Sequence, residues 1–535
     1  MGREFAMQSY PALIGGRDGE HTEWIHAVHA ASMLRDEMAV LKLKRQLDRG
    51  KISATDDPRI LGRVGICDRD QIIAASAAAR AAQPAWAAMG MDTRIEFARQ
   101  VGKIVQSNAD RFVEILTAEG HPKKLAEWEV SGAISMTNEA SLELYRHQMR
   151  QISHVGGREI RLVRKPDGVV CVHPPYNAPT ANSIVSLGAL IVGNTIVVKA
   201  PRSAAFGTAW FWRELIAPVL DGLGAPAGTA NMICAAPNEA LDIWLDSPDV
   251  DDLMFFGDSE RGIEIGQRWS AHGKKAVLEL GGNDGVLVWR DADVDLAAKA
   301  LAECFYGSAQ VCIVPKYAIV HPDIADAVVM RLVEIAKEIR PGYPEDDDCL
   351  LSPVLKAEDF MTALTDALAQ GAELVYGGNR MEVTGEVSDL GYFVQPTIIT
   401  VNGLQAADRL DAVRRETFFP LLPIIIPSPA ADDELLTESI AFINSNQYGL
   451  RNSLWTADSD VIDQFCERVE NGGLLKVNDS HIGFVIGLPS QGGAGLSGGP
   501  YGEGNFPILR TSRLQGISIA SDVHPRSAVF DTSVS

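Results

Sequence analysis

The strongest constraint on the fold lies between about residues 168 and 290, where short apolar runs alternate with longer helical segments. An unbroken apolar run is typical of a strand buried on both faces of a sheet, and helical crossovers make neighbouring strands parallel. The sequence therefore predicts an α/β fold with a doubly wound sheet of the nucleotide-binding kind. The predicted strands are Val169–Val172, Thr195–Lys199, Asn231–Ala235, Asp252–Phe256, Ala276–Leu280 and Gly285–Trp289.

Further elements are predicted on both sides of this region. A hairpin is expected over Met149–Arg164, because Gly156 and Gly157 tolerate the positive φ of a tight turn. We interpret His26 and His29 as solvated residues of a charged helical segment, not as metal ligands. Between the strands of the central region, helices are predicted over Ala204–Leu223 and Glu260–Ala271. The remaining predictions are helices over Arg69–Ala88, Arg94–Glu119 and around Leu34–Arg49, and a strand over Leu514–Ala520.

Size, charge and cysteine content narrow the class of protein. A chain of 535 residues is too long for one small core, so two or three domains are expected. The net charge of −22 argues against nucleic acid as a partner, and no apolar stretch is long enough to span a membrane. The seven cysteines fit neither a disulfide framework nor a zinc site, so we expect no bound metal and a reducing, cytoplasmic location. The N-terminal sequence lacks the pattern of a secretory signal.

A thiol and a carboxylate on two glycine-rich turns indicate covalent catalysis. Glu279 lies in Leu278-Glu279-Leu280-Gly281-Gly282-Asn283, and Cys312 ends the later stretch Gly307-Ser308-Ala309-Gln310-Val311-Cys312. Such a pair suits a thioester that water then hydrolyses. Each residue also has a plainer interpretation, since a lone cysteine is more often a small core residue and a glutamate can simply end a strand.

A series of motifs extends over most of the chain, and its order and spacing carry a resemblance. The series is Pro174-Pro175-Tyr176-Asn177-Ala178-Pro179, Val197-Val198-Lys199-Ala200-Pro201-Arg202, Phe255-Phe256-Gly257-Asp258-Ser259-Glu260-Arg261-Gly262, the Glu279 turn, Gln310-Val311-Cys312, Glu416-Thr417-Phe418-Phe419-Pro420 and Asn446-Gln447-Tyr448-Gly449-Leu450. From about residue 60 to 520 it resembles the aldehyde dehydrogenase superfamily. The resemblance implies that an aldehyde is oxidised to a carboxylic acid with NADP or NAD as cofactor.

The resemblance also implies a role for each catalytic residue. Cys312 matches the nucleophile that forms a thiohemiacetal and then a thioester, and we expect the site to favour its thiolate. Glu279 matches the base that activates the hydrolytic water. Asn177 matches the oxyanion donor, together with the Cys312 backbone N–H; taken alone, it would be a turn residue among prolines.

The cofactor site implied by the resemblance combines side chains with backbone turns. Lys199 matches a contact to the cofactor ribose, Glu416 a contact to the nicotinamide ribose, and Phe418 the aromatic residue beside the nicotinamide. A helix that begins near residue 259 would direct its N-terminus at the pyrophosphate. Taken singly, these are an exposed lysine and an ordinary loop entering a strand. The other predicted cofactor residues are Pro175, Tyr176, Gly257, Asp258, Ser259, Gly262, Leu280 and Gly281.

Several positions depart from the family pattern. Arg202 stands where NAD-preferring relatives often carry glutamate, which favours NADP because a cation suits a 2′-phosphate. Asp258 would repel the pyrophosphate, unless it caps the helix that follows. Arg451 is an unusual charge at a small-residue position; it suits either a substrate carboxylate or the surface, and we expect the surface. Ala178 and Gln491 predict a wider or more polar tunnel, unless Tyr306 or the segment Ser480–Gly487 refills it.

The resemblance further implies three structural parts. These are a Rossmann-like cofactor domain (1–147 and 168–279, with 1–59 as an extension of uncertain role), an αβ catalytic domain (280–487), and a β oligomerisation flap (148–167) with the C-terminal tail (488–535). Because such flaps pair edge strands between subunits, we expect a homodimer or homotetramer.

Three alternatives stay open at this point. A dehydrogenase that passes the acyl group to coenzyme A is less favoured, because relatives of that kind generally lack the glutamate at position 279. An inactive structural or binding protein has only Asp258 and the extended N-terminus in its favour. A cofactor-independent thiol hydrolase could also use Cys312 and Glu279.

Overall fold

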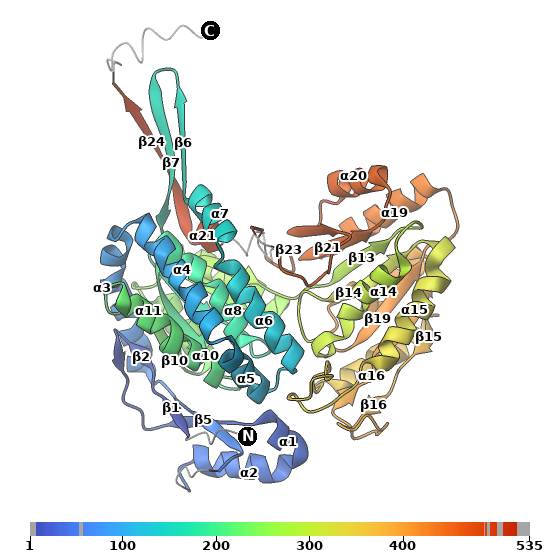
Figure 1. Ribbon diagram of the computed structural model, residues 1–535, viewed down its shortest axis with the longest axis horizontal. Helices are drawn as coiled ribbons and strands as arrows, with labels where there is room; N and C mark the ends of the chain where they lie inside the picture. Colours follow the sequence, from blue (N-terminus) through green and yellow to red (C-terminus); the bar gives the residue numbers. More distant parts are fainter. Residues whose placement is uncertain (1–6, 53–56, 486, 489–492, 500–506, 522–535) are drawn as a thin grey trace.

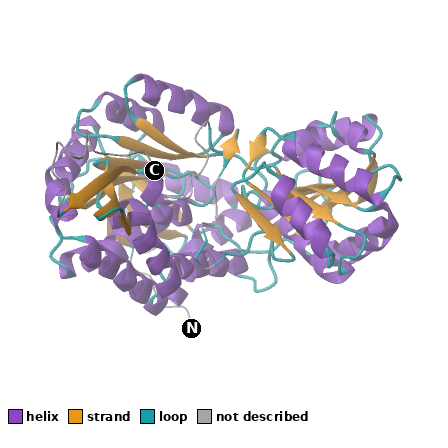
Figure 2. Ribbon diagram, turned by 90° about the horizontal axis from the view of Figure 1, so that it is seen from above, coloured by secondary structure: helices purple, strands orange, loops and turns teal. Residues whose placement is uncertain are grey.

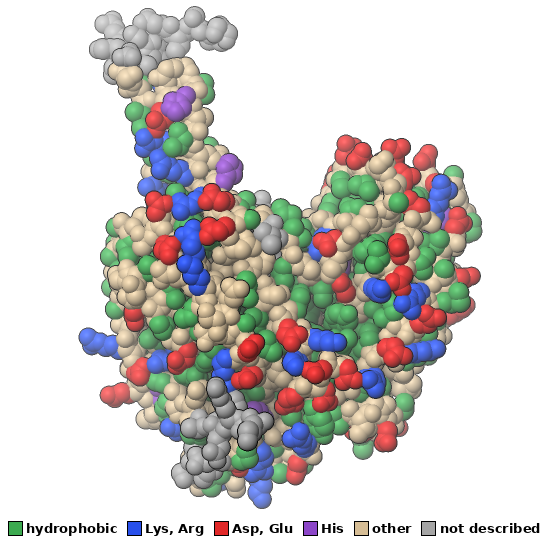
Figure 3. All heavy atoms as spheres, in the orientation of Figure 1, with side chains coloured by type: hydrophobic (Ala, Val, Ile, Leu, Met, Phe, Trp, Pro, Cys, Tyr) green, Lys and Arg blue, Asp and Glu red, His purple; other side chains and the backbone are tan. Residues whose placement is uncertain are grey.

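Two large α/β lobes and a projecting β arm make up the molecule (Figure 1). The computed structural model describes residues 7–52, 57–485, 487–488, 493–499 and 507–521, so Gln491 lies outside the described residues. Seen from above, helices flank the sheet of each lobe (Figure 2). Acidic side chains are spread over the visible face of both lobes (Figure 3). No helix of the described chain is long and apolar enough to cross a membrane.

The first lobe is built on the predicted doubly wound sheet. Its five central strands are parallel and buried throughout most of their length, which confirms the α/β prediction drawn from their apolar runs. A short antiparallel hairpin from the N-terminal region extends one edge. In spatial order the strands are β12 (Lys275–Glu279), β11 (Asp252–Phe256), β8 (Val169–His173), β9 (Thr195–Ala200), β10 (Ala230–Cys234), β2 (Leu13–Ile14) and β3 (Arg17–Asp18).

The second lobe has a sheet of its own. The last strand of the predicted run, β13 (Asp284–Val288), belongs to this sheet because the chain crosses between lobes at the turn after Glu279. All neighbouring pairs are parallel except the first. The order is β15 (Glu373–Tyr376), β18 (Thr397–Asn402), β19 (Leu421–Ile426), β14 (Pro315–Val320), β13, β21 (Arg451–Trp455) and β22 (Leu474–Val477).

The helices mostly follow the predictions, with one clear exception. The predicted helix Arg94–Glu119 is interrupted at Asn108, whose side-chain amide donates to the Ile104 carbonyl 2.8 Å away, so two helices replace one. The segment predicted over Ala204–Leu223 is helical but contains a π-helical stretch, η1 (Phe211–Ile216). The helices of the first lobe are α3 (Arg69–Ala88), α4 (Met91–Ser107), α5 (Ala109–Glu119), α6 (Lys123–Met136), α7 (Glu139–Met149), α8 (Pro179–Val185), α9 (Leu187–Val192), α10 (Phe206–Trp210), α11 (Ala217–Gly222), α12 (Pro237–Asp246) and α13 (Ser259–Ala271).

The helices of the second lobe cover both faces of its sheet. Their apolar faces form two large clusters with the strands. They are α14 (Val294–Ala302), α15 (Ala325–Glu338), α16 (Ala357–Ala369), α17 (Leu404–Ala407), α18 (Asp411–Arg414), α19 (Asp432–Asn444) and α20 (Ser459–Arg468).

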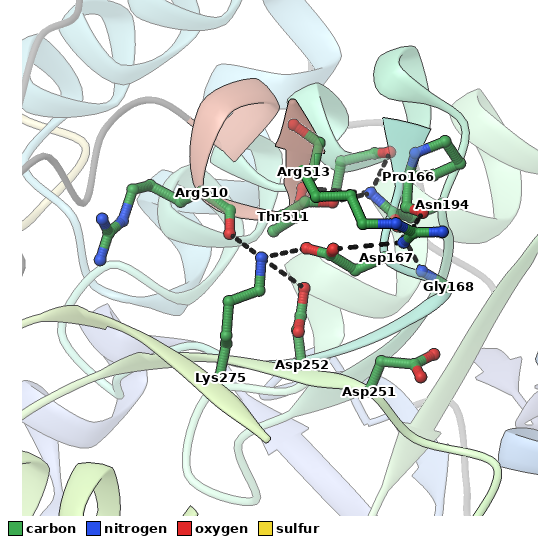
Figure 4. Close-up of polar contacts among 12 residues, drawn as sticks. Pro166, Asp167, Gly168, Asn194, Asp251, Asp252, Lys275, Arg510, Thr511 and Arg513 are labelled. Carbon is green, nitrogen blue, oxygen red and sulfur yellow. Dashed lines mark hydrogen bonds and ion pairs between the residues drawn. The ribbon is translucent and has the colours of Figure 1, made fainter. Parts of the chain in front are cut away.

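The arm is an antiparallel sheet of β6 (Arg150–Val155), β7 (Arg158–Pro166) and β24 (Ser512–Ala520) that extends away from the first lobe (Figure 1). It confirms the predicted hairpin, since Gly156 and Gly157 form the turn with φ of 55° and 72°. Polar contacts fix its base to the first sheet (Figure 4). The Lys275 ammonium contacts Asp167 and donates to the Arg510 carbonyl at 2.8 Å, while the Asn194 amide donates to the Thr511 carbonyl at 2.9 Å.

The N-terminal region forms a small sheet with the strand order β1 (Gln8–Tyr10), β5 (Ile60–Gly65) and β4 (Trp24–Val28). Along the chain, two helices lie between β4 and β5: α1 (Ala30–Arg35) and α2 (Glu37–Asp48). The helical prediction around Leu34–Arg49 is confirmed, but the interpretation of His26 as solvated is wrong. His26 lies on β4, is 4% exposed, and its Nδ1 lies 2.9 Å from an Asp48 oxygen. The strand faces this side chain toward α2, where the carboxylate partners it.

Candidate active site

The loop that carries Cys312 has an unusual backbone that several contacts hold in place. Gly307, Ser308 and Ala309 adopt φ of 59°, 55° and 58°, which is strained for the two residues that carry a Cβ. The ammonium of buried Lys316 donates to the carbonyls of Ala309 (2.8 Å) and Thr417 (2.6 Å). The Ser308 hydroxyl donates to the Ser352 carbonyl at 2.6 Å. The loop is therefore preorganised by its surroundings.

Asn177 lies beside this loop. Its side-chain amide donates to the Gln310 carbonyl at 2.9 Å, which leaves a second N–H of the same amide for another acceptor. Asn177 and Cys312 both line a cavity of about 520 Å³ between the two lobes. The structure thus brings together the predicted nucleophile and the predicted oxyanion donor.

The Glu279 turn lies against the same loop. A Cβ at Gly282 would stand 2.0 Å from the Cys312 carbonyl oxygen, so only glycine permits this close approach. Glu279 ends β12 and is 7% exposed, and its Oε1 has no hydrogen-bond partner among the described residues. Burial raises the pKa of Glu279 to about 8, against the opposing charge of Arg451. A carboxylate with such a pKa is suited to accept a proton near neutral pH.

The surroundings of Cys312 disfavour its thiolate, so our expectation for the thiol was wrong. Burial raises its pKa to about 12, and the carboxylates of Glu416, Asp284 and Glu279 act in the same direction. The Arg451 guanidinium acts in the opposite direction. Sequence motifs did not reveal this balance because the acidic groups come from separate segments of the chain.

The predicted cofactor side chains lie at the carboxyl ends of the first sheet and across the cleft from it. Lys199 is buried near the end of β9; burial lowers its pKa to about 8, and its ammonium has no hydrogen bond to another described residue. Glu416 accepts a 3.0 Å hydrogen bond from the Gly282 N–H. A Cβ at Gly281 would stand 2.4 Å from Glu416 Oε2. The ring of Phe418 lies 5.5 Å from the Lys316 ammonium.

The start of α13 confirms that Asp258 caps this helix. Its carboxylate accepts the Arg261 N–H at 2.9 Å and so caps the helix, as one of the two interpretations required. Ser259 follows with a buried hydroxyl that has no partner among the described residues. A Cβ at Gly262 would stand 2.1 Å from a Leu280 methyl group, so glycine lets the helix contact the Glu279 turn. The backbone N–H of Gly257 bonds the Glu279 carbonyl at 3.1 Å.

These observations test whether a dinucleotide fits. The Ser259 hydroxyl and the Lys199 ammonium are polar groups without protein partners in the described chain, and both lie at the carboxyl ends of parallel strands. That edge is where doubly wound sheets bind nucleotides, and the α13 N-terminus suits phosphate. The residues present therefore fit the predicted cofactor.

Other predicted residues line the cavity or adjoin it. Arg202 and Tyr176 line it together with Cys312, whereas Pro175 adjoins it along the chain. Arg202 is exposed and forms no ion pair with a described residue. Ala178 also lines the cavity, and Phe484, whose ring stacks on Trp128 with centroids 4.8 Å apart, occupies part of the same space. Phe484 belongs to the segment that we considered able to refill the tunnel.

Two buried cations lie near the site: Lys316, which no sequence motif singled out, and Arg451, which we expected on the surface. Lys316 anchors the Cys312 loop as described above, and its signal was a lysine within the apolar strand β14. Arg451 is 1% exposed, so the predicted surface position is wrong. Its Nη1 donates to the His481 carbonyl at 2.7 Å, and its backbone N–H points to Asp284 at 3.3 Å. The available signal was the single charge in β21, whose sequence is Arg-Asn-Ser-Leu-Trp.

Comparison with known proteins agrees with this geometry. The model of the aldehyde dehydrogenase family matches residues 48–508. The D-glyceraldehyde dehydrogenase (NADP(+)) of Thermoplasma acidophilum is 29% identical over 84% of this chain and 90% of its own length. The vanillin dehydrogenase of Pseudomonas fluorescens is 29% identical over 85% of this chain and 92% of its own.

Solved structures show the same fold. An NAD-dependent aldehyde dehydrogenase from Sinorhizobium meliloti superposes with a TM-score of 0.80 at 23% identity, covering 98% of this chain and 97% of its own. A glyceraldehyde-3-phosphate dehydrogenase from Methanocaldococcus jannaschii, complexed with NADP, superposes with a TM-score of 0.74 at 26% identity. The match covers 86% of this chain and 97% of that structure. The chain belongs to the aldehyde dehydrogenase family, and it is an oxidoreductase that oxidises aldehydes to acids.

Proposed function

We propose that this chain oxidises its aldehyde by the hydrolytic route, with Cys312 as nucleophile, Glu279 as general base and Asn177 as oxyanion donor. The observation that carries the proposal is the contact between the two catalytic turns, where only glycine at position 282 lets the Glu279 turn lie against the Cys312 carbonyl. Asn177 completes the group because its amide bonds the Gln310 carbonyl of the same loop.

The Cys312 thiol gives its proton to solvent, its sulfur attacks the aldehyde carbon, and the electron pair of the C=O π bond moves to the oxygen, which becomes an oxyanion. The free N–H of Asn177 and the Cys312 backbone N–H hold this oxyanion; removing one such donor typically costs about 3 kcal/mol. The nicotinamide, when bound, supplies the acceptor for the hydride that leaves the same carbon. Glu279 then takes a proton from water as the water attacks the thioester, and the acid leaves as the Cys312 sulfur recovers its electron pair.

We favour NADP as the cofactor, with NAD as the alternative. Arg202 is exposed on the shared cavity and unpaired among described residues, as a contact for a 2′-phosphate requires. Relatives named for NADP support the choice, although an NAD-dependent structure is also similar. Lys199, Ser259 and Glu416 would hold the remainder of the dinucleotide.

We divide the chain as expected from the resemblance, with the cofactor domain at 1–147 and 168–279, the catalytic domain at 280–487, and the flap at 148–167 with the tail. The arm leaves apolar side chains such as Ile152, Val155 and Leu514 exposed, which supports pairing between subunits in a homodimer or homotetramer. All seven cysteines are free, which supports a reducing, cytoplasmic setting.

The proposal is tested by absorbance at 340 nm with NADP or NAD and a panel that includes glyceraldehyde and vanillin. Aldehyde-dependent reduction with an acid product is expected. An acyl-CoA product that requires added coenzyme A would establish the acylating alternative instead. Ester hydrolysis that needs no nicotinamide, without any dehydrogenation, would establish the thiol hydrolase.

A further inference from the structure

The loop of residues 480–484 has no role in the mechanism above, yet it forms part of the wall around the nucleophile. Ile482 belongs to the apolar cluster against which Cys312 packs. Phe484 lines the same cavity as Cys312, and its ring stacks on Trp128 with centroids 4.8 Å apart and planes 21° apart. The loop belongs to no helix or strand, so side chains from other segments must fix its position.

His481 lies at the centre of this loop and is completely buried, with 0% of its surface exposed. Its Nδ1 lies 2.6 Å from Ser453 Oγ and its Nε2 lies 3.3 Å from Asp284 Oδ2. Burial lowers the pKa of His481, and a neutral imidazole has one donor and one acceptor, which these two partners use. Because Ser453 belongs to β21 and Asp284 to β13, the imidazole ties the loop to two strands of the second sheet.

Three buried charged side chains hold the polar groups on either side of this imidazole. They are Arg451, which donates to the His481 carbonyl at 2.7 Å, Glu303, which accepts from the Ile482 N–H at 3.1 Å and from the Ser480 hydroxyl, and Lys476, which donates to the Gly483 carbonyl at 2.7 Å. Supporting hydrogen bonds of this kind lock the side chains of a site into one geometry. The loop is therefore fixed to the second lobe along its whole length.

The ring of Phe484 reaches from this loop to the first lobe. Its stacking partner Trp128 lies on α6, and a Cβ at Gly132 of the same helix would stand 2.5 Å from the ring. Glycine at this position therefore leaves the room that the ring occupies. Because Phe484 follows His481 by three residues, a shift of the loop would move the ring relative to Cys312 and change the shape of the cavity.

Building on the proposed function, we propose that His481 is a positioning residue for substrate selection: it anchors the 480–484 loop to β13 and β21 and so holds Phe484 where its ring contacts the tail of the aldehyde. His481 is not among the described residues that line the cavity, so it acts through Phe484 and does not meet substrate itself. The stacked rings of Phe484 and Trp128 suit a flat, apolar tail, so an aromatic aldehyde fits this surface better than a short aliphatic one.

The test measures kcat and KM for benzaldehyde and for propanal in the full chain with saturating cofactor. His481→Ala frees the loop and should raise the KM for benzaldehyde about tenfold or more, while the KM for propanal and both kcat values stay within about threefold. His481→Gln keeps a donor and an acceptor and should recover part of the loss. An unchanged ratio of the two KM values in folded His481→Ala would overturn the proposal.

A milder variant is available if His481→Ala does not fold. Ser453→Ala removes only the partner of Nδ1, so it should shift the KM ratio in the same direction by a smaller factor. The parent ratio in folded Ser453→Ala would then overturn the proposal. Trp455→Phe is the matched control, because Trp455 is a buried residue at the other end of the same strand. It is expected to lower the thermal midpoint and leave the ratio unchanged; the same shift in this control would show that the effect follows stability alone.

A double variant tests whether His481 acts through Phe484. Phe484→Ala should raise the KM for benzaldehyde by itself, and adding His481→Ala should change the ratio by less than about twofold, because the side chain that His481 positions is already gone. A full additional loss in the double variant would contradict this role.

A binding measurement separates the role of His481 from the proposed chemistry. The Kd of benzaldehyde, measured by calorimetry in a Cys312→Ala background, should rise about tenfold or more with His481→Ala. If Cys312→Ala still dehydrogenates aldehydes, the proposed nucleophile is wrong, whatever the His481 variants show. If Cys312→Ala is inactive and the Kd does not change with His481→Ala, only the role of His481 fails.

Discussion

The nucleophile side and the cofactor side of the active site differ in how fully their polar groups are paired. On the nucleophile side, the strained turn before Cys312 is held by hydrogen bonds from Lys316, Ser308 and Asn177. On the cofactor side, Lys199 and the Ser259 hydroxyl have no hydrogen-bond partner within the described chain. The first side is built to hold one geometry, and the second retains polar groups for a ligand.

This difference predicts which kinetic parameter each substitution should change. Substitutions on the nucleophile side should reduce the rate of the chemical step with little effect on cofactor binding. Substitutions on the cofactor side should alter cofactor affinity or preference and leave the rate of the chemical step unchanged.

The largest effect is expected from Cys312→Ala. Loss of the nucleophile should lower kcat by at least about 10⁴-fold, while the thermal midpoint and the cofactor Kd stay close to the parent values, because the paired loop does not use the sulfur for support. Activity is measured at 340 nm and cofactor binding by calorimetry. Dehydrogenation by the variant would show that the sulfur is not the nucleophile. A large change in the cofactor Kd would contradict the claim that the nucleophile side does not affect cofactor binding.

The next effect concerns the pH dependence of Glu279. Because burial raises its pKa to about 8, the base is present above that pH and is lost as the pH falls below it. Hydrolysis of the acyl-enzyme should therefore slow about tenfold per unit below pH 8, and Glu279→Gln should remove this slope and slow hydrolysis by about 10²–10⁴-fold. Rapid-quench measurement of acyl-enzyme decay checks both; an identical pH slope in the variant would assign the base elsewhere.

A smaller effect is expected from Arg202→Glu on the cofactor side. The exchange of a cation for an anion should shift the ratio of kcat/KM for NADP over NAD toward NAD by about 10–100-fold, with kcat little changed. Arg202→Met serves as the matched neutral control and should fall between the two. The same ratio in all three proteins would show that Arg202 does not reach the 2′-phosphate.

The smallest effect is expected from Asp258→Ser. Serine caps a helix about as well as aspartate, so stability should change by less than about 0.5 kcal/mol while a negative charge near the pyrophosphate is lost. Cofactor Kd should fall a few-fold, more at low salt than at high salt. A Kd that is unchanged at both salt concentrations would mean that the capping carboxylate does not act on the phosphates.

Much of the fold could be predicted because local patterns encode it. The strands from Val169 to Glu279 have continuous apolar runs, and Gly156-Gly157 specifies the hairpin turn of the arm. The break at Asn108 could not be foreseen, since a side-chain amide competes with the helix there. His26 was misread because its partner, Asp48, lies on a different element.

The residues of the candidate site could be predicted from the sequence, but the charges around them and their pKa values could not. Ordered motifs identified Asn177, Glu279 and Cys312, and the structure brings their turns together; their catalytic roles stay predictions. The burial of Arg451 depends on packing between distant segments. The pKa of Cys312 is raised first by burial and then by carboxylates of distant segments, and no local pattern contains either effect. The positive φ at Ser308 and Ala309 is likewise enforced from outside, by Lys316 and its neighbours.

The most direct test of the central claim is to trap the acyl group on Cys312. Glu279→Gln is mixed with aldehyde and cofactor, quenched, and examined by peptide mass spectrometry. The account predicts one equivalent of reduced cofactor formed in a burst and an acyl adduct on the peptide that contains Cys312. A burst without an adduct at Cys312, or an adduct on another cysteine, would contradict it.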